Sequence, residues 1–256
     1  MINIKSDREI KIMREVCKLV AETHDVLSEN IKPGVSAYDL DMMAEKFIKS
    51  KGGIPSQKDF PSEKEGIKNF PSTLCVSIND EIIHGIPTKN KIIKDGDIVS
   101  IDLTVFKNGF HGDAARSHLV GNVSKNAKEL VEATKQAFFE GIKFAKPGFR
   151  IGDISFAINE YIRKYGYSVL KEFQGHGIGK EMHEDPGVPN YGKRDKGPRL
   201  EQGMVLAIEP MISAGKPDMV ESEDGWTIKI KDGSLSAHYE NTILITENEP
   251  EILTMI

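Results

Sequence analysis

The chain has 256 residues, 39% of them hydrophobic and 29% charged, which is enough apolar material for a sizeable core. Its 34 basic and 39 acidic residues give a net charge of −5, whereas a general nucleic-acid binder usually carries a clustered basic surface. No stretch approaches the roughly 18 to 20 apolar residues of a membrane span, and we expect no secretory signal. The two cysteines lie far apart, so we expect a reducing, cytoplasmic location. From the net charge and the lack of a membrane span, we expect no specific nucleic-acid partner and no membrane partner.

The N-terminal segment predicts two helices joined by a short turn. Ser6 and Glu9 have the spacing of a capping box, and an apolar stripe follows on one helix face. The stripe consists of Ile12, Met13, Val16, Cys17 and Val20. Lys32-Pro33-Gly34 ends this helix, because proline cannot continue a helix and glycine suits the turn. A shorter helical pattern then begins near Asp39.

A β-hairpin is predicted further along the chain. Residues 98–106 are rich in β-branched side chains and lead to Asn108-Gly109, a strong hairpin-turn signal. A two-residue turn at this point pairs Thr104 with Asp113. Because side chains alternate across a strand, Asp102 then shares a face with Asp113, diagonally and about 7 Å away at the backbone. Either both carboxylates point into solvent, or a bound cation relieves their repulsion.

The second half of the chain repeats the helical pattern of the first. Residues 124–145 predict another long amphipathic helix, and Lys146-Pro147-Gly148 repeats the earlier turn at an offset of 114 residues. A chance likeness between two helix–strand segments is the alternative explanation. From the repeat we predict one domain over residues 1–256, with halves of about 1–123 and 124–256 that are related by a pseudo-two-fold axis. The expected fold class is α+β, with helices covering a curved antiparallel sheet.

Polar residues of the two halves also correspond. The apolar strand that ends at Asp102 is repeated by one that ends at Glu209, and Asp113 has a counterpart in Glu240. His176 lies between two glycines, which allow a close approach of backbone and ligand. Four carboxylates and one imidazole suit divalent ions such as Mn, Fe(II), Co or Zn. Their charge matches two ions roughly 3.5 Å apart, which would acidify a shared water into a hydroxide nucleophile and favour hydrolysis.

These residues lie in motifs that resemble those of type I methionine aminopeptidase over nearly the whole chain. In chain order, the motifs are Asn79-Asp80-Glu81-Ile82-Ile83-His84-Gly85-Ile86-Pro87, Asp102, Asp113, Gly175-His176-Gly177-Ile178-Gly179, His183-Glu184, Ile208-Glu209-Pro210 and Tyr239-Glu240-Asn241-Thr242. The resemblance implies the pita-bread fold, with two metal ions between related halves. Only 33 residues separate His176 from Glu209, whereas type II members carry a long helical insertion there.

The resemblance also implies a role for each metal ligand. Asp102 is expected to chelate one metal ion, and His176 and Glu209 are expected to bind the other. Asp113 and Glu240 are expected to bridge the two ions. The resemblance thus implies two divalent ions (Co, Mn, Fe(II) or Zn). Whether a monovalent cation also binds is an open question.

Three residues are expected to act in catalysis. By the resemblance, His84 lies near the substrate amine, His183 contacts the carbonyl side of the scissile bond, and Glu209 is a candidate general base. Peptide hydrolysis also needs a proton for the leaving amine. Either Glu209 or His84 delivers it, and the sequence does not choose between them. His238 lies on the same predicted strand face as Glu240, where it could support a ligand.

An apolar pocket for a methionine side chain is implied as well. Its expected residues are Phe70, Cys75, Met182, Met211 and Trp226. Sulfur and aromatic side chains suit a thioether. Phe70 and Met182 depart from the best-known bacterial pattern, which has a tyrosine and an aromatic residue at these positions. The polar stretch 57–69 has the character of an insertion near the pocket mouth.

The function expected from the resemblance is removal of the N-terminal methionine from nascent proteins and peptides with a small second residue. The attacking group would be a metal-bridged hydroxide. We expect a cytoplasmic monomer that meets nascent chains, with ribosome association as an open question. One alternative is a proline-specific aminopeptidase or dipeptidase, although the large N-terminal domain usual in those relatives is missing from this sequence. The other is a binding-only pseudoenzyme, which normally loses its ligands.

Overall fold

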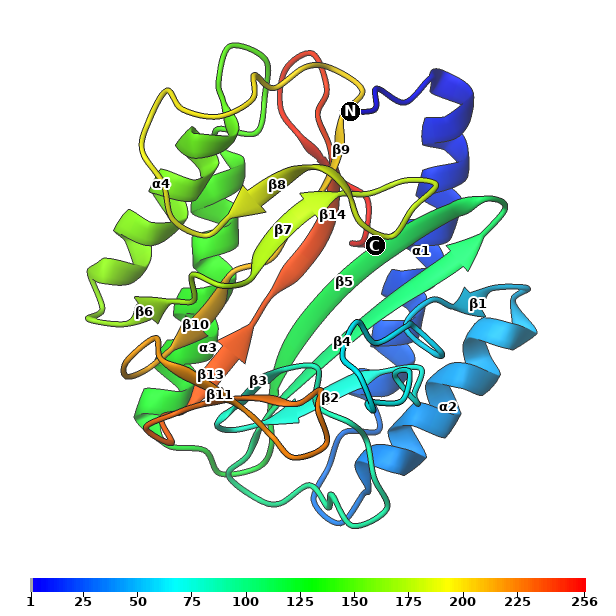
Figure 1. Ribbon diagram of the computed structural model, residues 1–256, viewed down its shortest axis with the longest axis vertical. Coiled ribbons are helices and arrows are strands. Elements are labelled where there is room, and N and C mark those ends of the chain that lie inside the picture. Colours follow the sequence, from blue (N-terminus) through cyan, green and yellow to red (C-terminus); the bar gives the residue numbers. More distant parts are fainter. Residues whose placement is uncertain (1) are drawn as a thin grey trace.

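The computed structural model describes residues 2–256 (Figure 1). Its helices are α1 (Asp7–Ser28), α2 (Ala37–Ser50), α3 (Lys125–Ile142) and α4 (Ile151–Arg163). Its strands are β1 (Ile54–Pro55), β2 (Cys75–Ile78), β3 (Glu81–Ile83), β4 (Ile98–Lys107), β5 (Phe110–Leu119), β6 (Ser168–Val169), β7 (Gln174–Gly177), β8 (Glu184–Pro189), β9 (Val205–Ile208), β10 (Met211–Ser213), β11 (Met219–Glu221), β12 (Ile228–Ile230), β13 (Ser236–His238), β14 (Glu240–Leu244) and β15 (Glu251–Ile252). The α+β class predicted from the sequence is confirmed.

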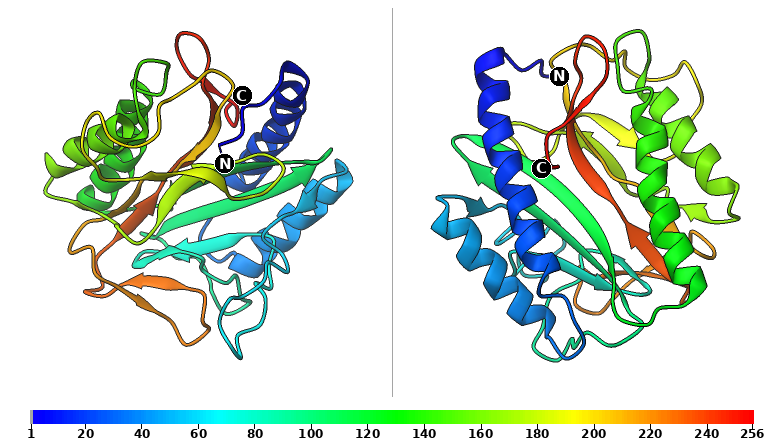
Figure 2. Two further views of the ribbon diagram at one scale, coloured as in Figure 1. Left: turned by 45° about the horizontal axis from the view of Figure 1, so that its top comes forward. Right: turned by 180° about the vertical axis from the view of Figure 1, so that it is seen from behind.

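Helix α1 begins where the sequence predicted. The hydroxyl of Ser6 accepts a hydrogen bond from the backbone N–H of Glu9, whose carboxylate in turn accepts from the backbone N–H of Ser6. Met13, Val16, Cys17 and Val20 of the predicted apolar stripe are fully buried, whereas Ile12 is only partly buried against the same cluster. Seen from behind (Figure 2, right), α1 and α3 lie across the same face of the main sheet. This helical layer leaves the opposite face of the sheet to the candidate site.

The backbone repeats its conformation at corresponding turns of the two halves. Gly34 and Gly148, which follow the two Lys-Pro turns, have φ angles of +91° and +96°. Gly96 and Gly203, which precede the corresponding strands, have φ angles of +94° and +89°. Glycine occupies all four positions because a Cβ atom disfavours positive φ. The sequence repeat therefore corresponds to a repeated local structure.

The largest sheet has nine strands and carries ligand candidates from both halves. Its hydrogen-bonded order is β1-β4-β5-β14-β9-β7-β8, with β2 beside β4 and β15 beside β14. Consecutive neighbours on this path pair antiparallel. Strands β5 and β14 lie side by side near its middle, so the two halves meet there (Figure 1).

The predicted register of the β4–β5 hairpin is confirmed. Lys107 pairs with Phe110, and Thr104 pairs with Asp113. Asp102 pairs with Ala115, so it lies on the same face as Asp113 and diagonal to it.

The predicted strand that carries His238 and Glu240 is interrupted, because β13 ends at His238 and β14 begins at Glu240. The chain is also interrupted between β9 and β10, at Glu209 and Pro210. Strand β14 pairs in the large sheet, whereas β13 pairs with β10 in a three-stranded sheet. Tyr239 stands at the break and donates its backbone N–H to the carbonyl of Pro210. Pro210 has no backbone N–H with which to continue the hydrogen-bond ladder. Both segments of the chain pass between the large sheet and the three-stranded sheet at this point. Glu209 lies directly at this crossing.

Apolar side chains fill two main clusters on the helical side. One packs α1 and α2 against β4 and β5, and the other packs α3 and α4 against the second half of the sheet. Within residues 2–256, no helix combines the length and the hydropathy that a membrane span requires.

Candidate metal centre

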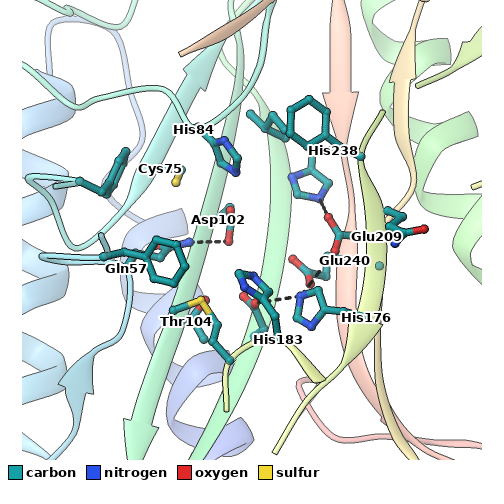
Figure 3. Close-up of a pocket in the computed structure, with 18 of the residues that line it drawn as sticks. Gln57, Cys75, His84, Asp102, Thr104, His176, His183, Glu209, His238 and Glu240 are labelled. Carbon is teal, nitrogen blue, oxygen red and sulfur yellow. Dashed lines mark hydrogen bonds and ion pairs between the residues drawn. The ribbon is translucent and has the colours of Figure 1, made fainter. Parts of the chain in front are cut away.

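The five predicted ligands converge on the sheet face opposite the helices. They come from neighbouring strands: Asp102 from β4, Asp113 from β5, Glu240 from β14, Glu209 from directly after β9 and His176 from β7. Figure 3 labels Asp102, His176, Glu209 and Glu240. His176 Nε2 lies 3.7 Å from Glu209 Oε1 and 3.9 Å from Asp113 Oδ2. One ligand atom each of Asp113, His176 and Glu240 fall within 4.8 Å of one another.

These side chains line a cavity of about 360 Å³. Its wall is mixed, with carboxylates and imidazoles beside aromatic and sulfur-containing side chains. It is formed by Gln57, Phe60, Phe70, Cys75, Ile83, His84, Asp102, Thr104, Asp113, Phe173, Gln174, Gly175, His176, Met182, His183, Glu209, Trp226, His238 and Glu240.

Burial opposes charge on all four carboxyl groups. It raises the pKa of Asp102 to about 7, and it raises the pKa of Asp113 well above the ordinary value, with the Asp102 charge as a further cause. The pKa values of Glu209 and Glu240 are also raised, first by burial and then by the neighbouring carboxylates. Holding four negative charges here at neutral pH therefore needs positive charge between them.

The donor set fits metal ions. Asp113 Oδ1 and Glu240 Oε1 are buried and have no hydrogen-bond partner among the described residues. Burial lowers the pKa of His176 to about 4, so its imidazole is neutral at neutral pH and can bind a metal through a nitrogen. Carboxylate oxygens with one imidazole suit hard or borderline divalent cations. A divalent cation among them would pair the orphaned oxygens and offset the charge repulsion.

Small residues allow the close strand packing that carries His176. A Cβ atom on Gly175 would lie 2.3 Å from the carbonyl oxygen of Ala207, and one on Gly177 would lie 2.2 Å from the carbonyl oxygen of Asp185. Neither contact is sterically possible, so β7 can approach β9 and β8 only with glycines on both sides of His176.

Backbone contacts hold the carboxylates on β5 and β14. Asp113 donates its backbone N–H to Thr242 Oγ1, and that hydroxyl donates back to the carbonyl of Asp113 at 2.8 Å. The guanidinium of Arg116 donates to the carbonyl of Glu240 and lies over the ring of Tyr239, 4.8 Å from its centroid. These contacts orient the strands from which the carboxylates project.

His84 occupies an unusual backbone conformation beside the cavity. Its φ angle is +56°, in the left-handed region that non-glycine residues seldom adopt. The next residue, Gly85, packs so closely on β2 that an added Cβ would lie 2.3 Å from the carbonyl oxygen of Val76. Burial lowers the pKa of His84 to about 4. Its ring lies edge-on to Phe173 and Trp226, with centroid distances of 5.7 and 6.5 Å.

His183 lies on the other side of the ligand cluster. Its ring is perpendicular to that of His176, with centroids 4.6 Å apart, and the ring of Phe60 lies 5.7 Å away. Burial lowers the pKa of His183, which favours the neutral imidazole. A neutral imidazole can donate one hydrogen bond into the cavity.

The predicted methionine pocket is only partly reproduced by the cavity wall. Phe70, Cys75, Met182 and Trp226 line the cavity, with the Phe70 and Trp226 rings edge-on at 5.3 Å. Cys75 pairs directly with Asp102 across β2 and β4. Met211 differs from the expectation: it is fully buried in an apolar cluster and is not one of the lining residues.

Eight lining residues were not among the predicted site residues: Gln57, Phe60, Ile83, Thr104, Phe173, Gln174, Gly175 and His238. Gln57 and Phe60 belong to the 57–69 stretch, which lacks any regular periodicity and so gave no orientation for its side chains. Phe173 precedes β7 and contacts His84. His238 was considered only as a support, and its Nε2 lies 3.8 Å from Glu209 Oε2. The sequence indicated His238 only because it lies two residues before Glu240 and therefore on the same face of the predicted strand.

Comparisons with known proteins agree with this geometry. The chain matches the model of metallopeptidase family M24 over residues 11–247. It is 49% identical over 255 residues to methionine aminopeptidase from Clostridium acetobutylicum, covering 100% of this chain and 99% of that protein. It superposes on the crystal structure of methionine aminopeptidase from Thermotoga maritima with a TM-score of 0.95 and 42% identity, covering 100% of both chains. The prolidase from Pyrococcus furiosus matches with a TM-score of 0.76 and 26% identity, covering 99% of this chain but 65% of that one.

Proposed function

We propose that this chain, which belongs to metallopeptidase family M24 and within it to the methionine aminopeptidases, removes N-terminal methionine. The reaction would be a metal-dependent hydrolysis at the cavity described above. The family resemblance and the pita-bread fold inferred from the sequence are confirmed by the full-length matches. The observation that carries the proposal is the convergence of four buried carboxyl groups and one imidazole in a cavity that aromatic and sulfur-containing side chains also line.

The proposed ligands are the five residues predicted from the sequence. Asp102 would hold one divalent ion, His176 and Glu209 the other, and Asp113 and Glu240 both. The two buried oxygens without partners, on Asp113 and Glu240, support this assignment. When bound, the ions supply Lewis acidity, which lowers the pKa of a water and polarises a carbonyl group. Candidate ions are Co, Mn, Fe(II) and Zn.

Side chains around the ligands would carry out the proton transfers. Glu209 is the proposed general base, which takes a proton from the attacking water and can return it to the leaving amine. His183 would donate a hydrogen bond to the oxygen of the scissile carbonyl, where negative charge develops. His84 would contact the substrate amine, and it is the alternative donor of the proton to the leaving group. The apolar walls would exclude other water from the reaction.

The apolar side chains of the cavity wall would select the methionine side chain. Phe70 and Trp226 offer aromatic edges, and Cys75 and Met182 offer polarisable sulfur that suits a thioether. A small second residue in the substrate is expected from the family resemblance.

The proposal is tested with the purified protein, supplied with Co²⁺ or Mn²⁺ and with short peptides. Met-Ala-Ser should release free methionine, a chelator should stop the release, and added metal should restore it. Cleavage of Xaa-Pro peptides alone would favour the proline-specific alternative instead. A protein that binds no divalent metal and cleaves neither peptide would support the binding-only alternative.

Nascent polypeptides in the cytoplasm are the proposed physiological substrates. Both cysteines, Cys17 and Cys75, are buried and unpaired, in keeping with a reducing compartment. Action as a monomer, a monovalent cation site and association with the ribosome stay predictions. Sedimentation of the protein with and without ribosomes would test two of them together.

A further inference from the structure

We propose that Gln57 is a positioning residue that holds the carboxylate of Asp102 in its metal-binding orientation, a role that rests on the proposed metal centre. The side-chain amide Nε2 of Gln57 donates a hydrogen bond to Asp102 Oδ1 at 3.0 Å (Figure 3). Asp102 lies on β4, and Gln57 lies in the stretch that follows β1, so the contact joins two segments 45 residues apart.

The neighbours of Gln57 are anchored on both sides. Ser56 donates its backbone N–H to the carbonyl of Thr104 in β4 at 2.9 Å. Lys58 points the other way and donates to Glu45 Oε1 on α2 at 2.8 Å. Between these two anchored neighbours, the side chain of Gln57 lines the cavity.

The chemistry of the pair decides which end of the amide faces Asp102. An ionised carboxylate only accepts hydrogen bonds, so the amide must present its NH₂ group. Its oxygen, Oε1, is then buried, with no hydrogen-bond partner among residues 2–256. A buried carbonyl oxygen without a hydrogen-bond partner destabilises a fold, whereas an apolar side chain of the same length would leave no unpaired polar atom. Gln57 is therefore a poor choice for stability alone.

The benefit of Gln57 falls on Asp102. A hydrogen bond to Oδ1 restricts rotation of the carboxylate of Asp102 and so holds the orientation that a bound cation would require. Outer-shell hydrogen bonds of this kind orient ligands, and losing one typically weakens metal affinity about 10- to 100-fold. The same stretch reaches a second site residue through Phe60, whose ring meets that of His183. It thus supports the centre at two points.

The test replaces Gln57 with methionine, which keeps the length of the side chain and removes both polar atoms. Titration calorimetry of the metal-free protein with Co²⁺ alone should show affinity weakened about 10- to 100-fold. The visible absorption bands of bound Co²⁺ should also change, because the ligand orientation changes. The urea midpoint of the metal-free protein should change little, because the substitution removes the unpaired Oε1 of Gln57 together with the hydrogen bond to Asp102. Gln57→Asn, whose amide is one methylene too short, should show the same weakened binding if the methionine variant folds poorly.

A matched control is available on α3. Gln136 Nε2 donates to Glu140 Oε1, also at 3.0 Å, far from the cavity. Gln136→Met should therefore leave Co²⁺ affinity and spectrum unchanged. Co²⁺ binding by Gln57→Met within twofold of wild type, or a wild-type protein that binds no Co²⁺, would overturn the inference. A wild-type protein that binds Co²⁺ but releases no methionine from Met-Ala-Ser would refute the proposed function alone.

Discussion

At the scale of single residues, the ligand cluster combines groups that are costly to bury with groups that are held in strained conformations. Asp113 and Glu240 are 5% and 2% exposed and carry orphaned oxygens, and His84 has a positive φ angle. Features of this kind persist where function requires them, because apolar or relaxed alternatives would be more stable. Each therefore predicts a substitution whose effects on stability and on activity differ.

Asp113→Asn should separate these two effects. The substitution keeps the shape of a ligand proposed to serve both ions and removes its charge, so activity should be lost and Co²⁺ affinity should fall by more than the roughly 10- to 100-fold typical of outer-shell changes. The metal-free variant should be at least as stable as wild type, because one buried charge repulsion is removed. Calorimetry and urea unfolding measure the two quantities. A variant that is less stable without metal yet keeps its metal affinity would contradict the assigned role.

His84→Asn should reduce turnover and leave the metal ions in place. Asparagine tolerates the left-handed backbone conformation of residue 84, so the change removes the imidazole with little strain. Loss of an acid–base group usually lowers kcat about 10²- to 10⁴-fold. Steady-state kinetics on Met-Ala-Ser together with metal analysis provide the check. Release of metal by this variant would mean that His84 had been assigned the wrong role.

At the scale of elements, strand β7 depends on glycines to bring His176 to the site. Gly175→Ala would force a Cβ against the carbonyl of Ala207, so β7 and β9 must separate. Overpacking typically costs about 1–3 kcal/mol, and we expect that loss in the free energy of unfolding together with a larger loss of metal affinity. Gly109→Ala is the control, because its added Cβ would meet nothing within 4 Å and only its φ angle of +88° is strained. Equal metal affinity in both variants would argue against a positional role for β7.

Helix α2 carries a buried carboxyl group that should make stability depend on pH. Asp41 accepts a hydrogen bond from the backbone N–H of Leu74 at 2.8 Å, and burial raises its pKa from 3.8 to about 6. Between these values the folded protein binds more protons than the unfolded chain, so this group lowers stability as the pH rises from 4 to 6. Asp41→Asn carries no charge at any pH. The unfolding free energy of the variant minus that of wild type should therefore increase by about 2.4 kcal/mol between pH 4 and pH 7.

Denaturant unfolding of both metal-free proteins at several pH values measures this difference. Other titrating groups largely cancel, because both proteins contain them. A difference that stays constant from pH 4 to pH 7 would show that Asp41 keeps an ordinary pKa in the folded protein.

The parts of this fold that follow from local sequence were predictable, and those that depend on distant contacts were not. The register of β4 and β5 was predictable because the two-residue Asn108-Gly109 turn sets it directly. The break at Tyr239 was not, because it results from pairing with Pro210, a distant residue. Gln57 and Phe60 lie in a stretch without periodicity, so their approach to the site follows only from the tertiary structure.

At the scale of the whole molecule, the candidate centre joins the two halves of the chain. Asp102 and Asp113 come from the first half, whereas His176, Glu209 and Glu240 come from the second. Strands β5 and β14 already connect the halves through the sheet. Without cations, however, the buried carboxyl groups of both halves face one another across the seam, where burial raises their pKa values. Metal binding should therefore stabilise the assembled molecule as a unit.

Removal of metal should lower the melting temperature of the protein. A ligand that binds only the folded state at 100 times its Kd stabilises that state by about 2.7 kcal/mol. For a chain of this size, such a gain corresponds to a shift of about 5–10 °C. Thermal unfolding at graded Co²⁺ concentrations, compared with unfolding in a chelator, measures the shift, and it should be much smaller for Asp113→Asn. Identical melting temperatures with and without saturating metal would mean that the two halves are not linked by cations, because binding to the folded state alone must raise its stability.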